Sequence, residues 1–593
     1  MYLVYGWGYL TINIVLQLCS SLFLSNMKFS EMRSINRRRF KKHGKDKDGW
    51  NPLLNNMVQH TDTTNGGQIF NTERTQQYPD LISTELVNGE KALNVLKKTV
   101  NAHSTPQDIH TAAVMMKKWG EQNGVTVDKK EGSYPQDWLC EFQQLIDKHV
   151  EQHFPILPVE STTTQRCEQI EEFLKSTENV MLNEVHRLSP VLKDAGLLSY
   201  LIQSYNRHLF TKLDLLVNKD LSVNETFCLL QWGKRVFFSP DSQDVFSDCD
   251  PLLISGWFEK AKQKLLTILK DETSSVLQNI LNYEEEHKET SMDEEWFIRV
   301  HFDVTQCLIS SIQRAKKFSQ TLMHMVQILC LGELHSFVQK YVHVKKQHLK
   351  NLKHPMANSI HLFRIISTCM KLRCLAGQIA TQNKSKDFLN TVDMLKKLED
   401  HALSIVNKKI KHTAQVSLRS YFEKGNECIY KLTEEIEKQC ESLPQTHAAE
   451  EIRTIIVNLA YDCVSHVYLN CMINTKFKRL QKRWEDVEEV IRQDVQNFHN
   501  TFTQLNVDVE QNQLLVRMSE VLFTHDVETL KLTCGILFKD FPEDSDLYLP
   551  RLLRWKRTLS EQQVREILEV GRVGCQNPKK CSHPLMGLCC LGP

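Results

Sequence analysis

Helical periodicity is clearest in residues 257–280, which read WFEKAKQKLLTILKDETSSVLQNI. Apolar side chains recur there at steps of three or four residues, with one turn missed at Glu272, and they are Trp257, Ala261, Leu265, Ile268, Val276 and Ile280. An α-helix has 3.6 residues per turn, so this spacing places the apolar side chains on one face. We therefore expect a long amphipathic helix whose apolar face is covered by other helices.

Two later stretches repeat this spacing. One contains Ile452, Ile455, Leu459, Cys463 and Val467, and the other contains Val487, Ile491, Val495, Phe498 and Phe502. Proline is scarce around them, because only Pro355 lies between Pro251 and Pro444, and none lies between Pro444 and Pro542. Proline inside a helix costs about 3 kcal/mol, so such stretches permit long helices.

The fold class predicted from these patterns is all-α, an elongated rod of stacked antiparallel helical bundles like a tethering-complex subunit. Short breaks are expected at Ser239-Pro240-Asp241 and Phe541-Pro542-Glu543, where proline follows a helical pattern. Alternating strand patterns are nearly absent. The sequence has no fixed repeat period, which argues against a regular solenoid.

Charge is distributed unevenly along this chain of 593 residues, whose formal net charge is only +1. Nine basic residues lie between Lys28 and Lys47 against two acidic ones, so this arm carries about +7 and the remainder about −6. A cationic arm is attracted to an anionic membrane by roughly 1 kcal/mol per basic residue near the surface. A solvated tail or a nuclear-import-like run is the alternative. The acidic remainder argues against nucleic-acid binding.

The first 26 residues, Met1–Asn26, contain no charged side chain. That length suffices to cross a bilayer, which needs about 20 apolar residues. The alternatives are a transmembrane segment or an upstream extension of a chain that starts at Met27 or Met32. Beyond this leader we predict a basic, disordered arm at 27–79, a helical body at 80–570 and a Cys-rich flexible tail at 571–593.

Catalytic signatures are absent from the sequence, which contains no phosphate-binding loop, dinucleotide fingerprint, HExxH or GxSxG motif. We therefore predict no enzymatic activity, no cofactor and no metal site. The run Glu284, Glu285 and Glu286 is interpreted as a solvated helix end. The 18 scattered cysteines suit reduced thiols in the cytosol.

The C-terminal tail is rich in cysteine. Its residues Cys575, Cys581, Cys589 and Cys590 have spacings that fit no standard zinc knuckle. Cys590 is in register for prenylation, but Gly592 and Pro593 are poor residues at the end of such a motif. Reversible acylation of Cys589 or Cys590 is favoured over prenylation, because together with the basic arm it supplies the two signals that stable anchoring requires. The alternative, which is preferred to acylation, is a frayed tail without modification.

Two stretches of the helical body are familiar. Residues 191–286 contain AGLL (195–198), YNRH (205–208), LLQW (229–232) and DPLL (250–253). Residues 514–568 contain MSEVL (518–522), LKL (530–532), FKDFP (538–542) and LPRLL (549–553). In these motifs the chain resembles the exocyst complex component 3 family, and most closely its tumour necrosis factor alpha-induced protein 2 branch.

The resemblance implies a helical tether that binds exocyst subunits or SNARE proteins in vesicle docking and exocytosis. That branch is also associated with a Ral-type small GTPase, with membrane protrusions, and with an N-terminal basic region that binds phosphoinositide. By position this lipid-binding role falls on Arg37, Arg38, Arg39, Lys41 and Lys42.

The predicted function is a non-enzymatic, exocyst-related scaffold that is cytoplasmic and peripheral at the plasma membrane. Its basic arm binds anionic phospholipid, and its helical body presents faces to partner helices. Basic stretches at Lys345-Lys346 and at Lys476–Arg483 are further candidates for acidic contacts, although a plain exposed face is favoured for the second. The alternative function is an integral membrane protein anchored by residues 1–26, with a cytosolic interaction domain.

Overall fold

The structure is a computed structural model, and its chain divides into two units, Met1–Glu85 and Leu86–Pro593. The residues described below all belong to the second unit. They are 94, 97, 98, 105–123, 134–158, 163–239, 246, 249–286, 294–350, 359–380, 385–424, 432, 434–438, 447–506, 508–555 and 557–573.

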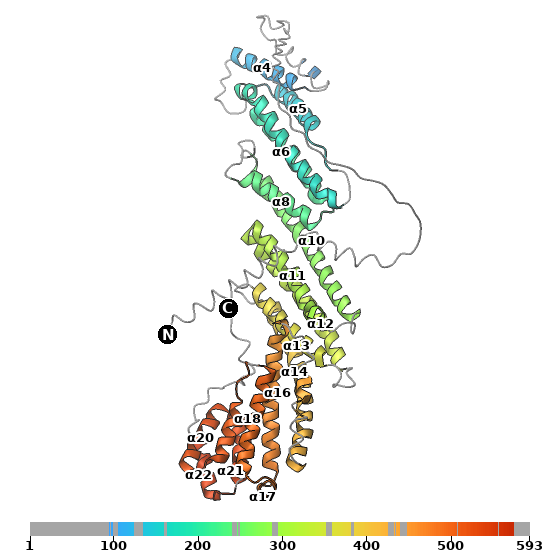
Figure 1. Ribbon diagram of the computed structural model, residues 1–593. Coiled ribbons are helices and arrows are strands. Elements are labelled where there is room, and N and C mark those ends of the chain that lie inside the picture. Colours follow the sequence, from blue (N-terminus) through green and yellow to red (C-terminus); the bar gives the residue numbers. More distant parts are fainter. Residues whose placement is uncertain are drawn as a thin grey trace, which may run out of the picture. The chain divides into compact units, whose positions relative to one another are not determined.

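Helices make up nearly all of these described residues, and no strand occurs among them (Figure 1). In chain order they are α4 (Pro106–Gln122), α5 (Gln136–His153), α6 (Thr163–Asp194), α7 (Leu198–Asn218), α8 (Val223–Phe238), α10 (Pro251–Glu286), α11 (Glu294–Phe318), α12 (Gln320–Lys350), α13 (Ser359–Ile379), α14 (Lys386–Lys424), α16 (His447–Asn474), α17 (Phe477–Gln481), α18 (Val487–Leu505), α19 (Gln513–Phe523), α20 (Val527–Asp540), α21 (Pro542–Trp555) and α22 (Glu561–Val573). The all-α prediction is confirmed, and the predicted breaks at Pro240 and Pro542 separate α8 from α10 and α20 from α21.

Consecutive helices pack mainly on one another and on the next helix but one. Helices α13 and α14 are antiparallel, because Lys409 bonds Ser359 while Arg373 bonds Glu399. By contrast, α10 and α12 run in parallel, since Lys340 bonds Gln278 and Lys345 bonds Glu284. This alternation is the geometry of stacked antiparallel bundles joined by short connections.

Local sequence explains where several helices begin. At α8, the hydroxyl of Ser222 accepts from the backbone N–H of Glu225, whose carboxylate accepts from the N–H of Ser222 at 2.7 Å. The same capping box opens α4 with Thr105 and Asp108. Such boxes satisfy backbone N–H groups that the first turn of a helix leaves unpaired.

The end of α6, at the motif AGLL (195–198), is also explained by local sequence. Gly196 has φ of 69°, in the left-handed region that costs a glycine little. Its N–H donates to the carbonyl of Lys193, and the N–H of Leu197 donates to the carbonyl of Leu192. These two bonds form a Schellman motif, which ends α6 and turns the chain into α7.

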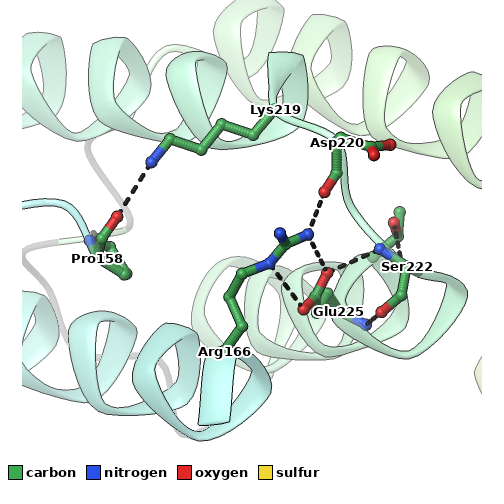
Figure 2. A network of polar contacts seen from close by, with 7 residues as sticks. Pro158, Arg166, Lys219, Asp220, Ser222 and Glu225 are labelled. Carbon is green, nitrogen blue, oxygen red and sulfur yellow. Dashed lines mark hydrogen bonds and ion pairs between the residues drawn. The ribbon is translucent and has the colours of Figure 1, made fainter. Parts of the chain in front are cut away.

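The junction of α6, α7 and α8 is closed by a polar network (Figure 2). Both nitrogens of the Arg166 fork lie 3.1 Å from the carboxylate of Glu225, and Nη2 also bonds the carbonyl of Asp220. Lys219 Nζ donates to the carbonyl of Pro158 at 3.0 Å. A single capping glutamate thus holds the start of α8 against α6.

The buried face of α10 differs from the apolar face predicted from the sequence. Its buried positions advance in steps of four residues: Trp257, Ala261, Leu265, Leu269, Thr273, Leu277 and Leu281. Val276 is instead 38% exposed, and no turn is missed near Glu272, because Thr273 continues the stripe. Four-residue steps advance by more than one helical turn, so the buried face winds slowly around α10 and rotates away from Val276.

The interpretation of Glu284 as part of a solvated helix end is wrong. Glu284 is 9% exposed, and Arg364 donates to both of its oxygens at 2.6 and 2.7 Å. Lys345 donates to one of them at 2.6 Å. Burial opposes the charge of this carboxylate, but the two cations overcome that effect and lower its pKa. Only Glu285 and Glu286 are exposed as expected.

One described helix, α12, is long and apolar enough to cross a membrane. Half of its most apolar window is buried against other helices, which is usual for the core helix of a helical bundle. The predicted leader and basic arm lie outside the described residues, and so does the tail from residue 574 on, with the candidate sites Arg37, Arg38, Arg39, Lys41, Lys42, Cys589 and Cys590. The start of the tail at 571 is corrected, because α22 continues to Val573.

Candidate functional site

A groove of about 1030 Å³ lies between α14, α16 and α21. Helix α16 forms its floor, and α14 and α21 form its walls. The α14 wall presents a stripe of exposed side chains at intervals of four residues, which are Lys411, Gln415, Arg419 and Glu423. This interval keeps them on one face of the helix, so the wall has a continuous polar edge.

Helix α21 is held in parallel with α16 by a ladder of side-chain bonds. From one end to the other, His466 bonds Asp544 at 3.0 Å, Asn470 bonds the hydroxyl of Tyr548 at 3.1 Å, and Arg551 bonds Asn474 at 2.5 Å. Trp555 Nε1 closes the ladder by donating to the carbonyl of Thr475 at 2.6 Å. The ladder fixes the register of this wall over about three turns.

The ion pair in this ladder depends on the charge of His466. Burial alone lowers the pKa of an imidazole, but the hydrogen bonds to the Asp544 carboxylate and to the Asp462 carbonyl raise it above its ordinary value. The protonated ring therefore persists to a higher pH than that of a free histidine.

Helix α14 is fixed to the floor through a buried carboxylate. The hydroxyls of Tyr421 on α14 and Tyr468 on α16 both donate to Oδ2 of Asp494 on α18, at 2.8 and 2.7 Å. Asp494 is 5% exposed, and burial raises its pKa to about 6, although the two hydrogen bonds work in the opposite direction. Three helices are thus joined at one oxygen atom.

A second contact holds the C-terminal end of α14. Both terminal nitrogens of the Arg483 guanidinium donate at 2.7 Å, one to the carbonyl of Phe422 and one to that of Glu423. Carbonyls in the last turn of a helix have no partner within the helix, so a cation placed there is stabilising. The groove therefore has walls that are tied to its floor.

The groove holds two thiols but no activated nucleophile. Burial raises the pKa of Cys463 to about 11 and raises that of Cys471 as well, although Lys411 and Arg419 act in the opposite direction. Both thiols therefore stay protonated at neutral pH, where the thiolate is the reactive form. Among the described residues, no group of three His, Cys, Asp or Glu side chains could hold a metal ion. These side chains are better suited to binding a partner than to catalysis.

The basic stretches singled out in the sequence have different environments. Lys345 is engaged by buried Glu284, and Lys346 is exposed. Lys476, Lys478, Arg479 and Lys482 are exposed, which fits the favoured interpretation of a plain surface, whereas Arg483 caps α14.

No sequence motif marks the groove. Its most exposed apolar side chains are Val416, which is 59% exposed, and Leu547, which is 51% exposed. About 130 residues separate them in the chain, and neither belongs to a recognisable motif. The available signal was an exposed apolar residue on an otherwise charged face, and such residues are common on protein surfaces.

No protein-family model matches this chain. Among solved structures, the crystal structure of M-Sec is similar, with a TM-score of 0.58 and 16% sequence identity over 85% of this chain and 90% of that chain. At this identity the likeness shows the fold. It agrees with the helical fold expected from the sequence, while the resemblance to a family remains a prediction. This chain is therefore similar in fold to M-Sec over most of its length.

Proposed function

We propose that this protein is a non-enzymatic, exocyst-related scaffold that joins a membrane surface to protein partners. The observation that carries the proposal is the likeness in fold to M-Sec across 85% of the chain. Stacked helices offer long faces for partner helices, and the groove between α14, α16 and α21 is one such surface. The protonated thiols of that groove agree with a binding role and not a catalytic one.

The membrane end of the proposal is the basic arm. Its charge of about +7 contrasts with about −6 on the remainder, so an anionic surface attracts the arm and repels the body. Arg37, Arg38, Arg39, Lys41 and Lys42 are the proposed contacts with phosphoinositide or other anionic phospholipid. Acylation at Cys589 or Cys590 would add a second anchor. The protein would then be cytoplasmic and peripheral at the plasma membrane.

The proposed partners follow from the sequence resemblance. They are exocyst subunits and SNARE proteins, with a Ral-type small GTPase as a further candidate. Their capture near a membrane would serve vesicle docking and exocytosis, or the formation of membrane protrusions.

Liposome co-sedimentation of the full chain tests the membrane end. Vesicles of phosphatidylcholine alone are compared with vesicles that also carry phosphatidylinositol bisphosphate, at low and high salt. We expect binding to the anionic vesicles that weakens with salt, because exposed charges are screened over about 10 Å at 0.1 M. Changing Arg37, Arg38, Arg39, Lys41 and Lys42 to alanine should abolish it.

The control changes four exposed cations of the body, Lys476, Lys478, Arg479 and Lys482, to alanine. We expect this variant to bind as the unaltered chain does. Equal losses in both variants would show general charge attraction, and binding that is insensitive to all of these changes would contradict the basic arm as the membrane contact.

The uncharged stretch Met1–Asn26 supports one competing function, an integral membrane protein with a cytosolic interaction domain. Extraction of cell membranes with alkaline carbonate separates the two. A peripheral scaffold is released into the supernatant, whereas a spanning helix keeps the chain in the membrane pellet.

A further inference from the structure

We propose that the groove between α14, α16 and α21 binds one amphipathic helix of a partner protein, with an acidic edge of that helix against α14. The inference deepens the proposed scaffold function by naming the chemistry of one partner. It is independent of the lipid contact, which lies outside the described residues.

The dimensions of the groove suit a helix. Its floor extends from Leu459 to Asn474 on α16, which at 1.5 Å per residue is about 22 Å, or four helical turns. The pairs that link α16 to α21 ascend together along both helices, as do the charges of Lys411 near Cys463 and Arg419 near Cys471. Three parallel helices therefore surround a space in which a fourth could pack ridges into grooves.

Apolar contacts are available on both walls. Val416 on α14 and Leu547 on α21 line the groove, and more than half of each side chain is exposed to water. Covering this apolar surface favours binding, because it removes the side chains from water. A helix with apolar residues at steps of three and four would cover both walls at once.

The charge on the α14 wall selects the sign of the partner. Lys411 and Arg419 are exposed there, and neither forms an ion pair within the part of the chain that the structure describes. They are eight residues apart, which is about 12 Å along the helix. Acidic residues seven or eight positions apart on a partner helix would face both cations. Glu423 on the same wall and Asp462 on the floor are opposite charges, which disfavour a uniformly acidic partner.

Charge disfavours the two most unusual segments of the chain itself as occupants. The residues after Val573 include Lys579 and Lys580 but no acidic residue, and the arm at 28–47 carries about +7. Each would meet like charge at Lys411 and Arg419. We therefore assign the groove to a helix of a separate protein and not to either of these two segments.

Selection from a randomised library of helical peptides displayed on phage tests the proposal, with the full chain as target. We expect the selected peptides to carry an apolar stripe and acidic residues seven or eight positions apart. A chain with Val416→Asp and Leu547→Asp should bind a selected peptide at least tenfold more weakly in fluorescence anisotropy. Both residues are exposed, so these changes leave the core intact.

Charge reversal supplies the matched control. A chain with Lys411→Glu and Arg419→Glu should no longer bind the acidic peptides. Its affinity for versions of these peptides in which lysine replaces the acidic residues should rise tenfold or more. Recovery of no peptide, of peptides without acidic bias, or of peptides that bind the Val416 and Leu547 variant equally well would overturn the proposal. Light scattering that showed a dimer dissociated by that variant would also overturn it, in favour of a second copy as the occupant. Vesicle binding is unchanged in every case, so the scaffold proposal is tested separately.

Discussion

Two buried carboxylates in this chain are satisfied in opposite ways. Glu284, between α10, α12 and α13, accepts from two cations, and its pKa is lowered. Asp494, between α14, α16 and α18, accepts from two tyrosine hydroxyls, and its pKa is raised to about 6. Both side chains are at least nine-tenths buried, so the difference comes from their partners and not from depth.

The comparison shows that neutral donors can satisfy the hydrogen bonds of a buried acid without offsetting the cost of its charge. The consequence is an opposite dependence on pH. The contribution of Glu284 to folding stability is present above the ordinary glutamate pKa of 4.5 and is lost as pH falls through its lower folded pKa. The contribution of Asp494 to folding stability is present below its ordinary pKa of 3.8 and is lost as pH rises through its folded pKa of about 6.

Removal of Arg364 should have the largest effect on stability. In Arg364→Met, Glu284 keeps only Lys345, and the guanidinium stacked 4.1 Å from the Trp296 ring is lost. Breaking a buried ion pair from one side typically costs 3–5 kcal/mol. We expect a loss of about that size in urea unfolding followed by circular dichroism, with faster hydrogen exchange in α10, α12 and α13.

The control for this variant is Glu284→Gln combined with Arg364→Met. Since the double variant leaves no unpaired carboxylate, it should recover at least half of the lost stability. A single variant that loses less than 1 kcal/mol would remove the contrast between the two sites.

Asp494→Asn should stabilise the protein at neutral pH. The folded pKa of about 6 exceeds the ordinary value of 3.8 by about two units, and ionisation of the folded chain therefore costs about 3 kcal/mol by pH 7. An amide keeps an acceptor for the tyrosines without this charge. Urea titrations at pH 4 and pH 7 should show a gain in the variant at pH 7 that disappears at pH 4, and a loss at both would contradict the assignment.

Arg166→Ala extends the comparison to a third carboxylate. Glu225 is fully buried but has one cation and one backbone N–H as partners, while a quarter of the Arg166 side chain is exposed. We expect a loss of about 2 kcal/mol, less than for Arg364, because water can reach the site. Thermal unfolding measures it, and Lys397→Ala, from an exposed pair with Asp393, should cost under 0.5 kcal/mol.

Tyr468→Phe should have a smaller effect than Arg166→Ala. It removes one of the two hydroxyls that donate to Asp494 and leaves Tyr421 in place, which costs about 1 kcal/mol. Since this bond favours the ionised carboxylate, its loss should also raise the pKa of Asp494. The pH at which the stabilising contribution of Asp494 is lost should therefore rise. A downward movement would show that the hydroxyl does not donate to the carboxylate.

Much of the helical framework was predictable because its causes are local. The stripe from Val487 to Phe502 is buried as expected, and Pro542 begins α21 where a break was predicted. The predictions that were wrong concerned which side chains of a helix contact other helices, because the periodicity of one helix does not identify its neighbours. Val276 fitted a helical face but is exposed, and Glu284 looked like a surface residue but lies among cations from two other helices.

The sequence alone determined that this chain forms long helices, where several of them start and stop, and that it lacks the common catalytic motifs. These depend on residues within one or two turns of each other. The tertiary structure decided which distant side chains meet, including the partners of Glu284 and Asp494 and the walls of the groove. Such meetings depend on how whole helices pack, and a helical pattern is compatible with many neighbours.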